Sequence, residues 1–433
     1  MNPGEPDNPS ASVIYLCPVN EQLTVAVLGG GAAGFFGAIA CAEANPGLRV
    51  LLIEKTGKLL SKVRISGGGR CNVTHAADTA AQLVQHYPRG ARQLKEPFKQ
   101  FGALDTVRWF EKRGVQLKTE PDGRMFPVTD SSETIAQCLL EAARRAGVQI
   151  LLQTTAEQIT PRPQGGFELQ LTGAHAQTLP VSRLLVATGG APKSEQYAWL
   201  RQLDHRIEEP VPSLFTFNVP NSPLRELPGV SVPRARVRVA GEKLEYEGPV
   251  LVTHWGVSGP AVLKLSAWGA RRLHELGYQS TTLINWLPDF TEDTLRQHLL
   301  EFRELHGKKV VVSNALLGLP QRLWRTLAEQ AGISPEIRWN ELPVKLQNRL
   351  IESLLRTALA VQGKTTYKDE FVTCGGISLS EINMKTMESR LVPGLHFAGE
   401  VLDVDGITGG FNFQAAWTTG FLAGRAMAAS GRD

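Results

Sequence analysis

The stretch TVAVLGGGAAGFFGAIACAEA, residues 24–44, decides the fold. It opens on a short β-branched and aliphatic run, and this pattern predicts a buried parallel strand over Thr24–Leu28. Gly29, Gly31 and Gly34 follow in the register G-x-G-x-x-G. The alanines and phenylalanines after them predict a helix. A strand, a glycine turn and a helix in this order are typical of a nucleotide-binding α/β unit.

Each of the three glycines has its own physical role in such a unit. Gly29 permits the tight turn, Gly31 lets the backbone approach a pyrophosphate, and Gly34 lets the helix pack closely against the strand. The N-terminus of the helix would supply unpaired N–H groups and a partial positive charge for the anion. The alternative is a glycine-rich turn in some other α/β unit.

A second buried run, Arg49–Ile53, predicts the next strand, and Glu54 ends it. Glu54 lies 20 residues after Gly34 (54 − 34 = 20), at the position where an acid accepts hydrogen bonds from ribose hydroxyls. Because an acid there favours an unphosphorylated ribose, these residues predict FAD or NAD rather than NADP.

The whole chain has 433 residues, which is too long for one ordinary core, so we expect two or three domains. No apolar stretch reaches the roughly 18 residues of a membrane span. Residues 1–22 have neither a positive n-region nor a long apolar core, and we interpret them as a disordered leader. The net charge of +4 is mildly basic, but no run of five like charges occurs, so no nucleic-acid partner is expected.

The five cysteines are scattered, and no two of them have C-x-x-C spacing. This pattern disfavours a thioredoxin-like dithiol and a zinc ribbon, so no metal site is predicted. An odd number of scattered thiols suits a reducing cytoplasm. We therefore expect a cytoplasmic protein with no membrane partner.

Two further glycine-rich stretches have features of ligand-binding loops. KVRISGGGRCN, residues 62–72, has three consecutive glycines before Arg70, which can form a nest of backbone N–H groups with a cationic clamp for phosphate or a flavin edge. RLLVATGG, residues 183–190, runs a buried strand into bare backbone. Taken singly, the first stretch could be a surface loop and the second a plain strand end.

Together, GGGAAG, ISGGGRCNVT, VATGG and GEVLDVDGITGGFNFQ (residues 399–414) resemble the flavoproteins with two dinucleotide-binding domains. The sequence is most similar to the aminoacetone-oxidase-like, or bile-acid dehydro-reductase-like, family of FAD-dependent oxidoreductases. The resemblance runs from about Thr24 to the end. It implies an α/β fold in which a discontinuous Rossmann-like FAD-binding domain is interrupted by an inserted antiparallel β subdomain and a helical subdomain. It implies FAD as the cofactor and does not name a substrate.

The domain boundaries follow from where the sequence pattern changes. We predict the FAD-binding domain over residues 23–192 and 364–433, the β-rich substrate subdomain over 193–288, and the helical subdomain over 289–363. Within the helical subdomain, apolar periodicity predicts a last helix over 342–361.

By family analogy, Glu400 reaches the ribitol hydroxyls, and Gly409 and Gly410 let the chain pass close to the isoalloxazine ring. Backbone N–H groups near residues 411–413 would point at the N1/C2=O edge of the flavin, at the positive end of the last helix. The predicted cofactor-binding residues are Gly29, Gly31, Ala33, Gly34, Glu54, Lys55, Lys62, Gly68, Gly69, Arg70, Cys71, Asn72, Ala156, Ala187, Thr188, Gly189, Gly190, Gly399, Glu400, Gly409, Gly410, Phe411, Asn412 and Phe413.

Two candidate catalytic residues complete the predicted site. Arg124 lies in a GRMFP motif that resembles a family segment over the flavin face, and it would orient an anionic substrate; a solvated surface arginine is the alternative. Histidine is the side-chain type suited to acid–base chemistry near neutral pH, so His254 could act as an acid or base; a structural histidine is the alternative. Because no second G-x-G-x-x-G follows a strand, NAD(P)H would have to visit the flavin face as a transient electron donor.

These features predict an FAD-dependent oxidoreductase that transfers hydride equivalents between non-covalent FAD and a small organic substrate, an amine or an enone-type carbonyl compound. Oxygen or NAD(P)H would be the other partner. Two rival functions stay open. One is a flavin-containing RNA-modifying or RNA-binding protein that uses basic residues such as Lys308, Lys309, Arg322 and Arg325. The other is a non-redox nucleotide sensor.

Overall fold

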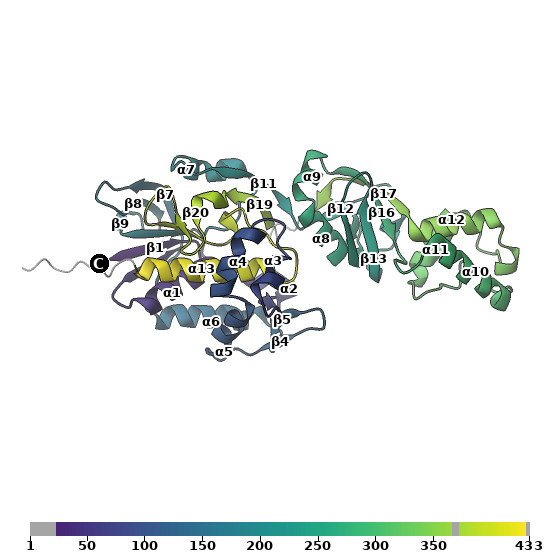
Figure 1. Ribbon diagram of the computed structural model, residues 1–433, viewed down its shortest axis with the longest axis horizontal. Coiled ribbons are helices and arrows are strands. Elements are labelled where there is room, and N and C mark those ends of the chain that lie inside the picture. Colours follow the sequence, from purple (N-terminus) through teal and green to yellow (C-terminus); the bar gives the residue numbers. More distant parts are fainter. Residues whose placement is uncertain (1–22, 366–371, 430–433) are drawn as a thin grey trace, which may run out of the picture.

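The computed structural model describes residues 23–365 and 372–429. The predicted leader, and parts of the second FAD-binding segment predicted over 364–433, lie outside these residues. Figure 1 shows an elongated molecule in which one half contains both ends of the described chain. The other half is an insertion made by the middle of the chain.

The terminal half is built on a seven-stranded sheet in the order β20-β21-β22-β10-β1-β2-β6. Its centre is parallel, because β1 pairs with β2 and β10, and β10 pairs with the C-terminal strand β22. Segments on either side of the insertion therefore share one sheet, which confirms the predicted discontinuous domain. The strands are β1 (Thr24–Leu28), β2 (Arg49–Ile53), β6 (Gln149–Leu151), β10 (Arg183–Val186), β20 (Ile382–Asn383), β21 (Glu388–Ser389) and β22 (Leu395–Phe397).

Two helices from opposite ends of the chain, α1 (Ala32–Ala44) and α13 (Phe411–Ala429), pack against each other beside this sheet (Figure 1). A Cβ atom at Gly420 would lie 2.4 Å from the Ala33 carbonyl oxygen, and one at Gly424 would lie 2.2 Å from the Gly37 oxygen. Backbone meets backbone at these positions, so only glycine fits. The small residues of the C-terminal helix are therefore a packing requirement.

Smaller elements surround the first sheet. Among them, β7, β8 and β9 form one three-stranded sheet and β3, β5 and β4 form another. Their bounds are α2 (Ser61–Gly69), β3 (Thr74–His75), α3 (Ala80–Val84), α4 (Ala91–Gln100), α5 (Ala103–Glu111), β4 (Leu117–Thr119), β5 (Arg124–Pro127), α6 (Ser132–Arg145), β7 (Thr154–Pro161), β8 (Phe167–Gly173), β9 (Gln177–Val181), η1 (Ser194–Tyr197), α7 (Ala198–Arg201), η4 (Leu379–Glu381) and η5 (Gly399–Val401).

The insertion contains an antiparallel sheet in the order β17-β16-β13-β14-β15-β12-β18, as the sequence predicts. A two-stranded ribbon, β11 with β19, links it to the terminal half, and a helical lobe lies at the far end (Figure 1). The bounds are β11 (Ile207–Ser213), β12 (Thr216–Asn218), η2 (Pro223–Glu226), β13 (Ser231–Val239), β14 (Glu245–Val252), β15 (Gly256–Ser258), α8 (Pro260–Trp268), α9 (Ala270–Glu275), β16 (Gln279–Asn285), α10 (Glu292–His306), α11 (Gln321–Gln330), η3 (Trp339–Glu341), α12 (Val344–Leu355), β17 (Thr357–Gln362), β18 (Lys364–Thr365) and β19 (Val372–Ile377).

The helix predicted over 342–361 is wrong at its C-terminal end. Helix α12 stops at Leu355, and Thr357–Gln362 forms strand β17, which pairs with β16. The segment TALAVQ alternates between buried and exposed side chains, which is the period of a half-buried strand. Because the apolar pair Leu354 and Leu355 directly precedes this strand, the change from helical to strand periodicity is not visible in the sequence.

Each half has its own large hydrophobic cluster. The first packs the parallel sheet against α1 and α13, and the second packs the antiparallel sheet and the helical lobe. Because buried apolar surface is the main source of stability, each half has the core that a separate domain needs. Across the described ranges, no helix combines the length and apolar character needed to cross a membrane.

Candidate functional site

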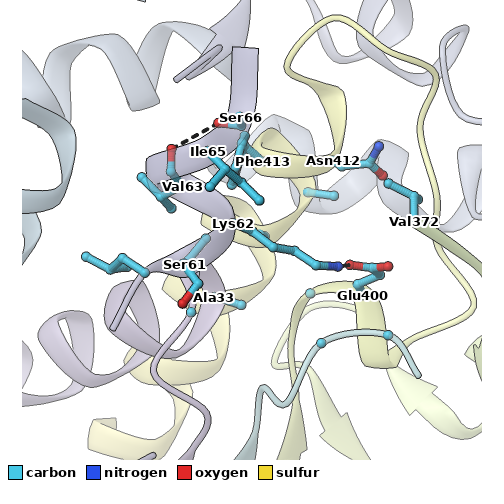
Figure 2. Close-up of a pocket in the computed structure, with 18 of the residues that line it drawn as sticks. Ala33, Ser61, Lys62, Val63, Ile65, Ser66, Val372, Glu400, Asn412 and Phe413 are labelled. Carbon is cyan, nitrogen blue, oxygen red and sulfur yellow. Dashed lines mark hydrogen bonds and ion pairs between the residues drawn. The ribbon is translucent and has the colours of Figure 1, made fainter. Parts of the chain in front are cut away.

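A cavity of about 640 Å³ lies at the carboxyl ends of the parallel strands of the first sheet. Its wall comes from residues 29–33, 187–190 and 398–400, which follow β1, β10 and β22, and from residues 407–416 at the start of α13. Figure 2 shows this cavity with side chains from α2 and α13 on its wall. In open α/β sheets this edge is where ligands bind.

Glu54 fixes one end of the cavity. Its carboxylate accepts hydrogen bonds from the backbone N–H groups of Gly30 and Thr56, both at 2.8 Å, and from the Thr56 hydroxyl at 2.8 Å. The acid is therefore held at the end of β2, beside the first glycine turn. This is the position that the sequence predicts for an acid that binds ribose.

The three glycines of the first turn divide into two kinds. A Cβ at Gly34 would lie 1.9 Å from the Gly29 oxygen, and one at Gly29 would lie 2.3 Å from the Ala187 oxygen. Close packing of the protein itself requires these two. A Cβ at Gly31 would meet no protein atom within 4 Å, and Gly31 has an ordinary extended backbone.

The open space beside Gly31 therefore shows whether the cavity fits a dinucleotide. Neither strain nor protein packing explains the missing side chain, but Gly31 lines the cavity and precedes α1 as its N-cap residue. An anion that approaches the N-terminus of α1 needs that open space. The geometry fits a pyrophosphate there.

Lys62 and Glu400 meet across the cavity, with 2.7 Å between the Lys62 Nζ and a Glu400 carboxylate oxygen (Figure 2). The other carboxylate oxygen of Glu400 accepts a hydrogen bond from the Thr373 backbone N–H at 2.8 Å. The Thr373 hydroxyl is buried and has no hydrogen-bond partner in the part of the chain that the structure describes. Thr373 is fully buried and outside the cavity lining, so of these two side chains only the Glu400 carboxylate is presented to the cavity.

The start of α13 forms the other end of the cavity. In its hydrogen-bonded orientation, the Asn72 amide oxygen accepts from the Gly410 N–H at 3.0 Å and its nitrogen donates to the Thr74 oxygen at 3.0 Å. The N–H groups of Asn412 and Phe413, in the first helical turn, donate to no protein acceptor among the described residues. Such unpaired groups and the helix dipole favour negative charge at this end.

Most of the predicted cofactor residues line this cavity. The lining includes Gly29, Gly31, Ala33, Glu54, Lys55, Lys62, Gly68, Asn72, Ala187, Thr188, Gly189, Gly190, Gly399, Glu400, Gly409, Gly410, Asn412 and Phe413. The structure places the others outside the lining, namely Gly34, Gly69, Arg70, Cys71, Ala156 and Phe411. Several of these residues pack behind the residues that form the cavity wall.

Arg70 and Cys71 belong to this supporting layer. The Arg70 guanidinium lies 4.0 Å from the centre of the Phe126 ring, which lines the cavity, and donates to Glu120 at 2.6 Å. Cys71 is fully buried, and burial raises the pKa of its thiol to about 12. A thiol with this pKa stays protonated at neutral pH, which disfavours a redox role.

The two candidate catalytic residues have different positions. Arg124 lines the cavity, but its guanidinium is bound to Asp122 at 2.7 Å and to Glu120 at 2.9 Å. His254 is exposed and lies outside the cavity lining, and its carbonyl oxygen accepts a hydrogen bond from Arg225. Of the two, only Arg124 is brought to the site.

Sequence reasoning missed a group of titratable side chains beside the start of α13. The His75 Nδ1 lies 3.1 Å from the Gly409 oxygen and therefore carries the proton of this hydrogen bond. The rings of His75 and His86 lie 4.7 and 4.3 Å from that of Phe411. Desolvation lowers the pKa of both imidazoles, that of His86 to about 4. The only sequence signal was the histidine that ends ISGGGRCNVTH.

Another cluster has the geometry of a hydrolytic triad but not its accessibility. The Ser389 Oγ lies 3.0 Å from the His205 Nε2, and the His205 Nδ1 lies 2.9 Å from a Glu381 oxygen. However, Ser389 and His205 are buried, and the serine oxygen already accepts from the N–H groups of Leu391 and Val392. We interpret this cluster as a structural network.

The parallel sheet, the acid at the end of β2 and the glycine-lined cavity define the class of protein: an FAD-dependent oxidoreductase built on a dinucleotide-binding fold. Residues 23–426 match the family described as HI0933-like protein Rossmann domain, and the chain belongs to this family.

Individual relatives are similar over nearly their whole length. The chain is 30% identical over 416 residues to 3-dehydro-bile acid delta(4,6)-reductase of Clostridium scindens, covering 93% of this chain and 98% of the relative. It is 31% identical over 420 residues to ribosomal RNA dihydrouridine synthase of Escherichia coli, and this match covers 95% of this chain and 99% of the relative. A solved 3-ketosteroid-delta4-(5alpha)-dehydrogenase from Rhodococcus jostii has a TM-score of 0.51 at 14% identity, with coverage of 95% and 98%. That similarity shows a shared fold.

Proposed function

We propose that the protein is an FAD-dependent reductase of a carbon–carbon double bond conjugated to a carbonyl group. The observation that carries the proposal is the pair of full-length relatives with nearly equal identity. One name describes reduction of ring double bonds in a 3-keto bile acid, and the other describes reduction of the uracil double bond. The two substrates differ in size, but both double bonds are conjugated to a carbonyl.

The cavity would hold FAD in an extended form. Glu54 would bind the adenosine ribose, the N-terminus of α1 at Gly31 would bind the pyrophosphate, and Glu400 would bind the ribitol hydroxyls. The first turn of α13 would face the pyrimidine edge of the flavin. Bound FAD supplies hydride transfer at its N5 atom.

The α13 dipole is a small influence on this chemistry. A partly buried helix terminus contributes up to about 2 kcal/mol to a nearby negative charge. For a two-electron couple, 1.4 kcal/mol corresponds to roughly 30 mV, so the effect on the flavin potential is at most about 45 mV. The helix tunes the cofactor, whereas the choice of substrate depends on the residues that face it.

The test begins with the absorption spectrum of the purified protein, which should show bound flavin. The holoprotein should bleach under anaerobic conditions with NADH or NADPH, and 4-androstene-3,17-dione or 2-cyclohexenone should then restore the oxidised spectrum. An amine that bleaches the flavin where the nicotinamides do not would contradict the reductase proposal. A flavin that no donor bleaches would support the non-redox nucleotide sensor instead.

The second candidate is the same reaction on uridine in RNA, and the Escherichia coli relative favours it. The cavity lies in the terminal half, and the helical lobe lies at the opposite end of the molecule (Figure 1), so a small substrate in the cavity would not reach the lobe. Its basic residues Lys308, Lys309, Arg322 and Arg325 are exposed and form no ion pair within the described ranges. They are therefore available to phosphates of a large substrate.

RNA as substrate is tested with ribosomal RNA transcripts and the NADPH-reduced holoprotein. Dihydrouridine detected by mass spectrometry, together with affinity that falls steeply as salt rises, would favour this candidate. The matched variant replaces Arg322 and Arg325 by glutamine; it should weaken RNA binding and leave reduction of 2-cyclohexenone unchanged. Steroid reduction without RNA binding would retire the RNA candidate.

A further inference from the structure

Leu214, between β11 and β12, has a backbone conformation that leucine rarely adopts. Its φ angle is +54°, in the left-handed region where a Cβ atom is crowded and glycine is favoured. A leucine there carries backbone strain that glycine would avoid and asparagine would reduce. Because strained residues persist only where the surrounding structure holds them, Leu214 is a candidate for a functional role.

The residues on both sides of Leu214 are fixed by hydrogen bonds. The Ser213 hydroxyl donates at 2.7 Å to the carboxylate of Asp405, in the loop that leads to α13. The Phe215 N–H donates at 2.9 Å to the Oγ of Ser266, on α8. All four of these partners are buried. A relaxed backbone at Leu214 would therefore disturb a buried hydrogen bond on one side or the other.

The side chain of Leu214 belongs to the cavity, although its backbone lies between the linking ribbon and the second sheet. It is half-buried, lines the cavity and packs against the hydrophobic cluster of the terminal half. Its neighbour Ser213 pairs with Val372, which also lines the cavity (Figure 2). Val404 and Ile407, from the loop before α13, line it as well. We call the side chains of Leu214, Val372, Val404 and Ile407 the apolar wall.

The apolar wall lies toward the α13 end of the cavity. Val372 directly precedes Thr373, whose N–H donates to Glu400 at 2.8 Å, and the proposed function assigns Glu400 to the ribitol. Ile407 directly precedes residues 408–410, which run into α13. The wall therefore lies between the groups assigned to the ribitol and those assigned to the flavin ring, at the end of the cavity where a substrate would meet the flavin.

We propose that Leu214 determines substrate specificity by contacting the ring that carries the conjugated double bond. The inference rests on the proposed function and narrows its substrate to alicyclic enones, whose ring is hydrocarbon apart from the double bond and the carbonyl group. Contact with the apolar wall removes such a ring from water and so contributes binding free energy. A uracil ring has polar N–H and C=O groups on most of its edge, and burying them against this wall without hydrogen-bond partners is unfavourable.

Leu317 provides a matched control within the same chain. It is also half-buried, and its φ angle of +57° places it in the same left-handed region. It packs against the hydrophobic cluster of the insertion and does not line the cavity. The same substitution at the two positions therefore changes backbone strain and packing alike, whereas only the substitution at Leu214 changes the cavity.

The experiment measures binding of 2-cyclohexenone to the oxidised FAD-containing protein. Oxidised flavin has no electrons to donate, so the enone binds without turnover, and its dissociation constant follows from the change in the flavin absorption spectrum. Uridine is the polar comparison. The wild type should bind 2-cyclohexenone about 10-fold more tightly than uridine, or better, because unpaired polar groups weaken binding by at least this factor.

Leu214→Asn tests the apolar wall, because asparagine is close to leucine in size, tolerates the left-handed region and is polar. It should raise the dissociation constant of 2-cyclohexenone about 10-fold, since the contacts of one half-buried leucine correspond to a change of this size. Leu214→Met keeps an apolar side chain and should bind nearly as tightly as the wild type. Leu317→Asn should bind as the wild type does. Flavin content and thermal midpoint show that each variant is folded.

Three results would overturn the inference: a wild type that does not bind 2-cyclohexenone, a wild type that binds uridine at least as tightly, or a Leu214→Asn variant that binds the enone as the wild type does. Equal weakening by Leu317→Asn would also overturn it, because the effect would then come from packing outside the cavity.

Reoxidation of the NADPH-reduced flavin separates this failure from failure of the proposed function. If 2-cyclohexenone binds through Leu214 but does not reoxidise the flavin, the substrate contact stands and the proposed function fails. If the enone reoxidises the flavin of Leu214→Asn with the kcat/KM of the wild type, the proposed function stands and the inference about Leu214 fails.

Discussion

The glycine cradle and the junction are two regions of one site that are built in opposite ways. The cradle, residues 29–33, 187–190, 407–410, 412 and 413, presents backbone groups to the cavity, and missing side chains give it its shape. The junction, formed by the Arg89–Asp405 ion pair and the Ala267 carbonyl of α8, joins the two halves through a mostly buried guanidinium. The cradle has the geometry of a cofactor site, whereas the junction holds α8 of the insertion against the terminal half.

The comparison teaches which of the two regions tolerates substitution. A backbone cradle binds the parts common to every dinucleotide, and it tolerates little change because its glycines have no substitute. A side-chain junction can change one residue at a time. Two relatives with nearly equal identity to this chain are named for substrates as different as a bile acid and ribosomal RNA.

The largest expected effect concerns the ion pair that ties the junction together. Arg89 is mostly buried and contacts Asp405, which is fully buried, while it also holds α8. Arg89→Met leaves a buried carboxylate without its cation, so the free energy of unfolding should fall by about 3–5 kcal/mol. Urea unfolding measures this loss. Arg92→Met, at an exposed position on α4, is the matched control.

A second substitution sharpens this test. Adding Asp405→Asn to Arg89→Met removes the stranded charge and should recover part of the lost stability. If Arg89→Met alone is as stable as the wild type, the pair does not hold the junction together.

Gly31→Val tests the cradle and should separate folding from cofactor binding. The new side chain meets no protein atom within 4 Å at its Cβ, so the apoprotein should unfold at the wild-type midpoint. FAD affinity should fall about 100-fold, or roughly 2.8 kcal/mol, because the side chain fills space beside the α1 N-terminus. Titration of the apoprotein with FAD, followed by flavin fluorescence, measures this affinity. Gly34→Val is the contrast, since its Cβ would overlap the Gly29 oxygen and should prevent folding. Normal FAD affinity in Gly31→Val would place the pyrophosphate elsewhere.

Glu54→Ala should have a smaller effect on the same binding. Loss of hydrogen bonds from ribose hydroxyls to a charged acceptor is expected to weaken FAD binding about 10-fold. The carboxylate also accepts from Gly30 and Thr56, so a loss of about 1 kcal/mol in apoprotein stability should accompany it. Glu54→Gln keeps one acceptor oxygen and should lie between the two. If Glu54→Ala binds FAD as tightly as the wild type does, the ribose lies elsewhere.

The smallest effect is a pH dependence from His86 at the junction. Its pKa in the folded protein is about 4, below the ordinary 6.5, because burial and the nearby Lys264 disfavour the charged form. Between pH 6.5 and 4 the unfolded chain binds a proton that the folded chain does not, so stability falls as pH falls through this window. His86→Gln should lose less stability than the wild type between pH 7 and 5. The difference is limited to about 1.4 kcal/mol per pH unit and is reduced by partial exposure. If urea unfolding shows that the wild type and His86→Gln lose equal stability between pH 7 and 5, this pH dependence does not come from His86.

How well the sequence predicted each part depended on the range of the interactions. The strands at 24–28 and 49–53, the glycine turn and Glu54 were predictable because one short segment contains the whole pattern. The end of α12 was not, because the apolar run through Leu355 continues into β17 and only pairing with β16 makes that segment a strand. His254 was proposed from its chemical type alone, and the fold leaves it exposed, outside the cavity lining.

The sequence by itself determined the cofactor class. Glycine spacing and an acid at a strand end act through local backbone geometry, which neighbouring residues fix. Only the tertiary structure decided that Thr373 lies beside Glu400 and that Arg89 bonds Asp405. Those side chains come from segments far apart in the chain, and their relation exists only once the two halves have packed together.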